Sequence, residues 1–172
     1  IKDLKIAHSE RWEKKIIQTI INSYKKAPYF EPTFEIIKKS FTFSKEAYLI
    51  DMHMNSFKAI NQYLGIKTEL VKSSRAYGKL DQVGQKRIIQ ICKKEHTTKY
   101  LNVMAGFDLY DSELFLNNGI ELFFIKTEDI SYKQFDDIFV KNLSIIDIMM
   151  FNSLDKIKKM LSSLSFVSKK SK

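Results

Sequence analysis

The sequence contains little cysteine, glycine or proline. Among its 172 residues there are one cysteine, five glycines and two prolines. A single cysteine, Cys92, excludes a disulfide framework within the chain and fits a reducing compartment, so we expect a cytoplasmic protein. Cys92 lies among isoleucines, which favours a core residue over a Cys/His nucleophile. The isolated Gly78 and Gly84 belong to no GxxxxGK pattern, which excludes a phosphate-binding P-loop.

Other functional signals are also absent. No apolar run is long enough for a membrane helix and no signal peptide is visible, so we expect no membrane span. The three histidines, His8, His53 and His96, are isolated, and no HxxxH or CxxC spacing occurs. We therefore expect no metal site. The GxSxG elbow of serine hydrolases is missing as well, so no hydrolase class is indicated by a motif.

Basic residues outnumber acidic ones. Lys and Arg total 29 against 20 Asp and Glu, which gives a net charge of +9. Such a balance raises the question of nucleic-acid binding. The lysines, however, are spread over nearly every predicted helix face, which argues against a nucleic-acid partner. The only dense basic run is at the end of the chain, where residues 165–172 are predicted to form a basic tail.

The first half of the chain is predicted to be helical. Ser9 can cap a helix over Glu10–Ala27, in which Trp12, Ile16, Ile20 and Tyr24 recur at helical spacing and predict a buried face. A second helix is expected through Lys39, starting near Pro32, and a third between Ser44 and Leu64, closed by Gly65. Towards the end of the chain we expect an ordered loop over 127–142, a helix capped by Ser144 and a last helix over Leu154–Leu164.

The middle of the chain alternates between strand-like and helical patterns. The strand-like segments are Thr68–Ser73, Thr98–Val103 and Glu121–Ile125, and the helical segments between them are Gln82–Glu95 and Ser112–Asn117. We expect Asp111 to cap the second helical segment and Gly119 to end it in the left-handed conformation. This alternation is typical of a parallel sheet. We therefore predict one α/β domain over residues 1–172, a three-layer fold with a short, mostly parallel sheet, flanking helices and a helical N-terminal half. Right-handed crossovers would bring the carboxyl ends of the strands to one edge, where ligands of open sheets bind.

Three groups of polar residues are candidate site residues. Ser73, Ser74 and Arg75 suit an anionic or polyhydroxylated ligand, although a plain polar turn is an alternative. Asn102 closes an apolar segment and Gly106 permits close approach of a ligand, or the two form only a strand-terminating turn.

The third group is Tyr132, Gln134 and Asp147. Asp147 lies within an apolar helix three residues after Ser144, so its carboxylate either completes a capping box, faces water, belongs to a buried structural network or serves a site. In a site, Asp147 would act as a general base or orient a hydroxyl group, while Asn102, Tyr132 and Gln134 would bind ligand hydroxyls.

These groups occur in an order that resembles the WbqC-like protein family. The resemblance rests on the following residues: Trp12, 27–30, 64–66, Ser73, Ser74, 87–93, 100–102, Gly106, Leu109, Tyr110, Phe115, Gly119, Ile120, 132–135, Phe139 and 143–152. It extends over almost the whole chain, but no single motif in it is a catalytic signature. The family's opening segment, rich in Pro, Tyr, Phe and Gly, has no counterpart here, so residue 1 corresponds to a point inside the family pattern.

The resemblance implies a role in bacterial O-antigen or other surface-polysaccharide biosynthesis. The implied activity is that of a transferase on a nucleotide-activated sugar or another sugar-modifying donor, with Asp147 as the catalytic residue. The implied ligand-binding residues are Ser73, Ser74, Arg75, Asn102, Gly106, Tyr110, Tyr132 and Gln134. A non-catalytic partner or regulator in a glycan-assembly complex is the alternative. The resemblance indicates no cofactor and no oligomeric state.

Overall fold

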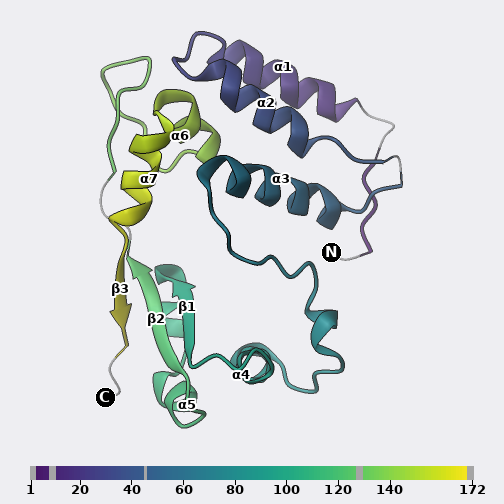
Figure 1. The fold of residues 1–172 in the computed structure, drawn as a ribbon, viewed down its shortest axis with the longest axis vertical. Coiled ribbons are helices and arrows are strands. Elements are labelled where there is room, and N and C mark those ends of the chain that lie inside the picture. The colour runs from purple at the N-terminus through teal and green to yellow at the C-terminus, as the bar shows by residue number, and fades with distance from the viewer. Residues whose placement is uncertain (1–2, 8–10, 45, 127–129, 170–172) are drawn as a thin grey trace. The chain divides into compact units, whose positions relative to one another are not determined.

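The computed structural model describes residues 3–7, 11–44, 46–126 and 130–169 and divides the chain into two compact units. Unit 1 contains residues 1–72 and 131–160, and unit 2 contains residues 73–130 and 161–172. Unit 1 is helical, whereas unit 2 contains the sheet (Figure 1). The chain is therefore mixed α/β, as predicted, with the helical elements concentrated in its first part.

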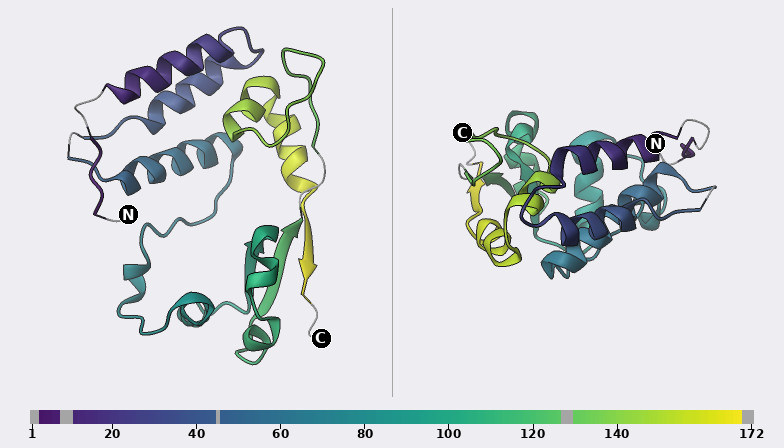
Figure 2. Two further views of the ribbon diagram at one scale, coloured as in Figure 1. Left: turned by 180° about the vertical axis from the view of Figure 1, so that it is seen from behind. Right: turned by 90° about the horizontal axis from the view of Figure 1, so that it is seen from above.

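Unit 1 is built from five helices. They are α1 (Trp12–Tyr24), α2 (Phe30–Ser40), α3 (Leu49–Leu64), α6 (Ile145–Phe151) and α7 (Leu154–Ser162). Helices α1 and α2 lie side by side (Figures 1 and 2). Gly65 ends α3 in the left-handed conformation, with φ of 73°, as the sequence predicts. No helix among the described residues is long and apolar enough to cross a membrane.

The core of unit 1 consists of two apolar clusters. In one, Ile20 of α1 and Ile37 of α2 pack around Met150 of α6. In the other, Ile36 and Leu64 pack against Met149 and Ile157. Both clusters depend on the apolar helix that follows Ser144, because Met149 and Met150 point into different clusters from adjacent positions.

The first helix differs in detail from the prediction. Its buried face contains Ile20, Ile17 and Tyr24, but Ile16 is 40% exposed. Trp12 is half-buried beside Phe41, with ring centroids 6.0 Å apart. The cap expected at Ser9 and the first residue, Glu10, lie outside the described residues.

Unit 2 contains a small mixed sheet in the order β1-β2-β3. The strands are β1 (Lys99–Val103), β2 (Glu121–Lys126) and β3 (Ser165–Ser168). Strands β1 and β2 run parallel, with Lys99 opposite Glu121 and Val103 opposite Ile125, whereas β3 runs antiparallel to β2. Figure 2 shows β3 alongside β2 from behind.

Helical segments cover one face of this sheet. These segments are the 3-10 helix η2 (Met104–Leu109) and the α-helices α4 (Gly84–Lys94) and α5 (Ser112–Leu116), whereas the 3-10 helix η1 (Ser74–Tyr77) lies next to α4. Ile89 and Cys92 of α4 and Phe115 of α5 form a core with Leu122 and Phe124 of β2. Leu101 and Val103, which alternate with the covered positions of β1, are 44% and 58% exposed. Cys92 is a buried core residue, and burial raises the pKa of its thiol.

Two predictions for the sheet are wrong. Residues 68–72 form no strand, and Ser73 caps η1, because an alternating pattern alone cannot form a strand without a hydrogen-bonding neighbour. The third strand is instead supplied by Ser165–Ser168, within the segment predicted to be a basic tail. Because β3 is antiparallel, the sheet is not mostly parallel, and the helices of unit 2 cluster on one of its faces.

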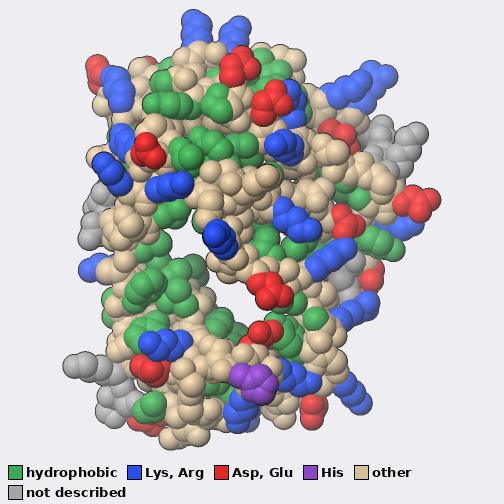
Figure 3. Space-filling model, in the orientation of Figure 1, with side chains coloured by type: hydrophobic (Ala, Val, Ile, Leu, Met, Phe, Trp, Pro, Cys, Tyr) green, Lys and Arg blue, Asp and Glu red, His purple; other side chains and the backbone are tan. Residues whose placement is uncertain are grey.

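Basic side chains are distributed over the visible surface (Figure 3). Lys and Arg side chains alternate with acidic and apolar ones on this face of the molecule and do not gather into one patch.

Candidate functional site

Asp147 is a buried carboxylate held by three side chains of unit 1. Its exposed fraction is 3%. Oδ1 accepts hydrogen bonds from the Tyr132 hydroxyl at 2.7 Å and from Gln134 Nε2 at 2.8 Å. Oδ2 accepts one from the Tyr24 hydroxyl at 3.0 Å. The network therefore joins α1, α6 and the loop that precedes α6.

The Gln134 side chain closes this loop by hydrogen bonding to the backbone of Val140. Its side-chain Oε1 accepts a hydrogen bond from Val140 N at 2.9 Å, and its Nε2 donates to Val140 O at 3.2 Å. Both ends of the amide are therefore used, and the loop between 134 and 140 is tied to Asp147 through one side chain. Lys133 and Asp137 form an ion pair within the same loop.

The charge of Asp147 is stabilised by hydrogen bonds. No lysine or arginine of the described residues forms an ion pair with Asp147. Burial first, and then the hydrogen bond to the carboxylate, raises the pKa of Tyr24 to about 12. The same causes, in the same order, raise the pKa of Tyr132 well above its usual range. Both hydroxyls therefore remain protonated donors at neutral pH, as an anionic acceptor requires.

Ser144 caps α6 without the help of the Asp147 carboxylate. Ser144 Oγ accepts a hydrogen bond from Ile146 N at 3.3 Å, and Ser144 O accepts one from Asp147 N at 2.9 Å. The hydrogen bonds that the Asp147 carboxylate accepts all come from side chains outside α6. Of the alternatives left open by the sequence, the contacts favour a buried network over a capping box.

In unit 2, the group Ser73–Arg75 packs on α4. Ser73 Oγ accepts a hydrogen bond from Arg75 N at 3.3 Å, which begins η1. Ser74 Oγ accepts one from Arg87 Nη2 at 2.9 Å. The sequence contains only three arginines, Arg11, Arg75 and Arg87. Two of the three therefore lie on adjoining elements, although sequence reasoning did not assign Arg87 to a site.

The beginning of α4 adds to the positive character of this surface. Its first turn contains no acidic residue, and no side chain caps it. The first turns of the other six α-helices each contain Asp or Glu. Free N–H groups and the helix dipole at such an end favour an anion. Ser73–Arg75, Arg87 and the start of α4 are called the arginine surface below.

Asn102, Gly106 and Tyr110 form a second cluster in unit 2. A Cβ atom on Gly106 would lie 2.9 Å from Asn102 Nδ2 and 3.3 Å from the Tyr110 ring. The space next to Gly106 is thus filled by these two side chains. Asn102 Oδ1 accepts a hydrogen bond from Val103 N at 2.8 Å. Burial, followed by the charge and hydroxyl of Tyr110, raises the pKa of the neighbouring Tyr100 to about 12.

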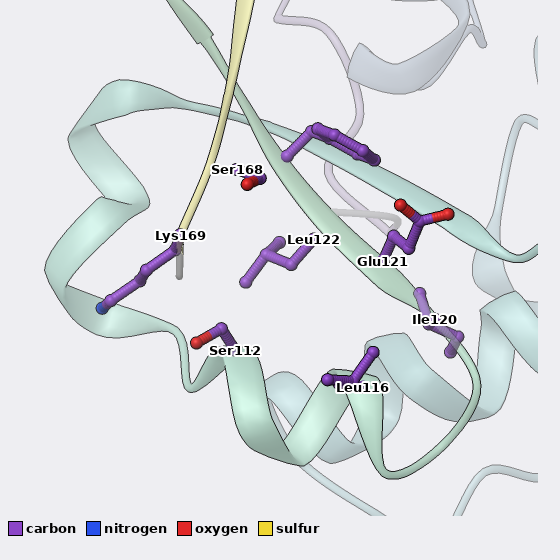
Figure 4. Close-up of a pocket in the computed structure, with 8 residues that line it drawn as sticks. Ser112, Leu116, Ile120, Glu121, Leu122, Ser168 and Lys169 are labelled. Atoms are coloured by element: carbon purple, nitrogen blue, oxygen red, sulfur yellow. The ribbon is translucent and has the colours of Figure 1, made fainter. Parts of the chain in front are cut away.

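A separate cavity of about 190 Å³ lies beside β2 and β3 (Figure 4). Its lining contains none of the residues predicted to form a site: Ser112, Leu116, Ile120, Glu121, Leu122, Phe123, Ser168 and Lys169. The Lys169 ammonium group donates to the carbonyl oxygens of Phe107 at 2.6 Å and Tyr110 at 3.0 Å. The Lys169 ammonium group is therefore paired within the protein, and Ser112, Glu121 and Ser168 are the other polar residues of the lining.

The predicted site residues divide between the two units. Unit 1 contains Tyr132, Gln134 and Asp147, which contact one another. Unit 2 contains the six others, which form two groups: Ser73, Ser74 and Arg75, and Asn102, Gly106 and Tyr110. Sequence reasoning missed Tyr24 and Arg87. Tyr24 is 123 residues from Asp147, and no local pattern connects them.

Comparisons with known proteins identify one family. Searches of curated proteins and of solved structures found no match. The model of the WbqC-like protein family matches residues 1–159, which is most of the 172-residue chain. The chain therefore belongs to the WbqC-like protein family.

Proposed function

We propose that the chain acts in O-antigen or other surface-polysaccharide biosynthesis, as a transferase that uses a nucleotide-activated sugar or another sugar-modifying donor. In this proposal a phosphate group of the donor binds at the arginine surface of unit 2. The observation that carries it is the hydrogen bond from Arg87 to Ser74, which sets a second guanidinium group beside Ser73–Arg75.

The chemistry of this surface suits a diphosphate. Guanidinium groups bind phosphate oxygens in a bidentate manner, which ammonium groups cannot do. Arg75 is exposed, and no described residue forms an ion pair or hydrogen bond with its guanidinium group. The uncapped first turn of α4 supplies further N–H donors. The hydroxyls of Ser73 and Ser74 provide short-range polar contacts for the same ligand.

In unit 1, we propose that Asp147 holds the loop and serves no proton transfer. Its oxygens already accept three hydrogen bonds, and only 3% of the residue is exposed. A general base must lie within hydrogen-bond reach of the substrate, which the burial of this carboxylate opposes. The catalytic role implied for Asp147 by the family resemblance remains a prediction.

The proposal is tested by calorimetric titration of the whole chain with UDP-glucose. Arg75→Gln and Arg87→Gln are the test variants, and Arg11→Gln is the matched control, because it removes the same charge from unit 1. We expect wild type and Arg11→Gln to bind equally, and each test variant to weaken binding by about tenfold or more. Equal affinity of all four proteins, or no binding of UDP-glucose and of UDP, would contradict the proposed phosphate site.

A second candidate function is that of a non-catalytic partner in a glycan-assembly complex. It is favoured by the loop that Gln134 and Asp147 hold in place. Four apolar side chains of this region are strongly exposed, with exposed fractions of 47% for Phe135, 82% for Ile138, 54% for Val140 and 44% for Leu143. Ordered, exposed apolar groups are typical of a protein-binding surface. Ile138→Ser would abolish complex formation in this case and leave UDP-glucose binding unchanged.

A further inference from the structure

A polar groove lies in unit 1, where the chain leaves α3 (Figure 1 shows this exit). Its volume is about 340 Å³. One wall is the last two turns of α3 and the other is the segment that follows. The lining residues are Lys58, Asn61, Gln62, Ile66, Lys67, Thr68 and Leu70. None of them was predicted to belong to a site, and none takes part in the Asp147 network.

A helix-ending turn forms the groove. Ile66 N donates to Asn61 O at 2.8 Å and Gly65 N donates to Gln62 O at 3.4 Å, which is the Schellman arrangement. Gly65 makes it possible, because its φ of 73° is strained for other residues. The turn reverses the chain, so the segment after Gly65 lies against α3.

The segment is also fixed at its other end. Lys72 forms an ion pair with Asp51 in the first turn of α3, with Nζ and Oδ1 2.5 Å apart. Residues 66–72 are therefore attached to α3 at both ends. A segment held in this way keeps the groove open in the absence of a ligand, which lowers the entropic cost of binding.

The groove offers hydrogen-bond donors and positive charge. Lys58 and Lys67 contribute ammonium groups, and no acidic residue lines the groove. Asn61, Gln62 and Thr68 contribute two carboxamides and a hydroxyl. Across the described ranges, none of these five side chains has a hydrogen bond or an ion pair with the protein.

A third ammonium group lies nearby. Lys158 Nζ of α7 is 3.7 Å from the position that a Cβ atom on Gly65 would occupy. The apolar side chains of Ile66 and Leu70 complete the lining. A volume near the lower end of the range of about 300–1,000 Å³ for ligand sites fits a small ligand.

We propose that this groove binds a small anion that also carries hydroxyl groups, such as a sugar phosphate or a sugar acid. The ammonium groups of Lys58 and Lys67 hold the phosphate or carboxylate. The carboxamides of Asn61 and Gln62 and the hydroxyl of Thr68 bind the ligand hydroxyls, and Ile66 and Leu70 contact the apolar face of the ring. The groove shares no residue with the arginine surface, and its existence does not depend on the proposed function.

The test measures binding of four probes to the whole chain by calorimetry at physiological salt: glucose 6-phosphate, glucuronate, glucose and inorganic phosphate. The test variant is Lys58→Gln/Lys67→Gln. The matched control is Lys25→Gln/Lys26→Gln, which removes two exposed lysines from the same unit and gives the same net charge. Asn61→Ala is a third variant, which leaves the charge unchanged.

We expect glucose 6-phosphate or glucuronate to bind, and the test variant to weaken that binding by about tenfold or more. The control variant should bind these anions as tightly as wild type does. Asn61→Ala should weaken the binding of the sugar anion more than it weakens the binding of inorganic phosphate. A preference between the two anions identifies the anionic group.

Three results would overturn the proposal: no binding of either anion, equal loss in test and control variants, or binding of glucose that is as strong as that of the anions. Arg75→Gln is predicted to leave this groove unaffected. Weaker anion binding in Lys58→Gln/Lys67→Gln, with unchanged binding in Arg75→Gln, therefore distinguishes the groove from the phosphate site proposed in unit 2.

Discussion

Removal of the Asp147 carboxylate tests whether this network holds unit 1 together. Asp147→Ala leaves three donors without their acceptor: the Tyr24 hydroxyl, the Tyr132 hydroxyl and one N–H group of Gln134. Each buried donor left unpaired costs about 1–3 kcal/mol, and the two half-exposed hydroxyls fall at the low end because water can reach them. We therefore expect Asp147→Ala to destabilise unit 1 by about 3 kcal/mol.

Asp147→Asn should cost much less, although it removes the same charge. The amide oxygen can still accept from Tyr132 and Gln134, and the amide nitrogen can donate to the Tyr24 oxygen. Hydrogen bonds to a neutral acceptor are weaker, but a neutral group is also cheaper to bury. Because these two effects oppose each other, we expect a loss of about 1 kcal/mol.

The pairwise contact is isolated by a double-mutant cycle with Tyr132→Phe. Alone, this change removes one charge-assisted hydrogen bond of 2.7 Å and should cost about 1.5 kcal/mol. In the Asp147→Ala background it should cost almost nothing, which gives a coupling energy of about 1–1.5 kcal/mol.

Urea unfolding followed by the fluorescence of Trp12 is the assay, because the single tryptophan lies in unit 1 and reports on that unit. Two results would refute the hypothesis that this network stabilises unit 1. One is that the effects of Asp147→Ala and Tyr132→Phe on the free energy of unfolding add within about 0.5 kcal/mol, and the other is that Asp147→Ala lowers this free energy by less than about 1 kcal/mol.

Three further results are expected. Gly119→Val should cost about 1–2 kcal/mol through backbone strain alone, since φ is 75° and a Cβ atom meets nothing within 4 Å. Gly119→Asn should cost less, and the assay is urea unfolding followed by far-ultraviolet circular dichroism, because Trp12 does not lie in the unit that contains Gly119. Gly106→Ala should lower the stability of unit 2, because its Cβ atom would overlap the Asn102 side chain. Adding Asn102→Ala should restore part of this stability, and a double variant as unstable as Gly106→Ala would show that the overlap is not the cause. For Tyr24, the pKa of about 12 lies above the ordinary 10.0, so the folded protein keeps a proton that the unfolded chain has lost. This contribution to stability is complete below pH 10 and disappears as the pH rises towards 12. In an ultraviolet titration of the folded protein, Tyr24→Phe should remove one tyrosine from those that ionise above pH 10.

The elements that the sequence predicted well are those set by neighbouring residues. Asp111 was predicted to cap the short helix, and its Oδ1 accepts from Glu113 N at 3.0 Å and Leu114 N at 3.2 Å. Gly119 was predicted to end that helix in the left-handed conformation, and its φ is 75°. Such turns are determined within a few residues, so the local sequence contains the necessary information.

The elements that the sequence predicted poorly depend on distant partners. The pattern of 68–73 is compatible with a strand, but its position is fixed by the turn at Gly65 and the ion pair of Lys72. Ser165–Ser168 is short and precedes a basic run, yet it becomes β3 because β2 offers a free edge. Strand formation follows from pairing, and pairing cannot be deduced from four residues alone.

The predicted site residues include two physical classes in this structure. Tyr132, Gln134 and Asp147 are explained by their contacts, since each completes the hydrogen bonding of the others in a buried network. Arg75 is not explained in this way, because its exposed guanidinium group has no partner among the described residues. We therefore propose that the search for the activity begin at the arginine surface, where this guanidinium group is available to a ligand. The contacts of Asp147 support a structural role for its carboxylate, and a catalytic role stays a prediction.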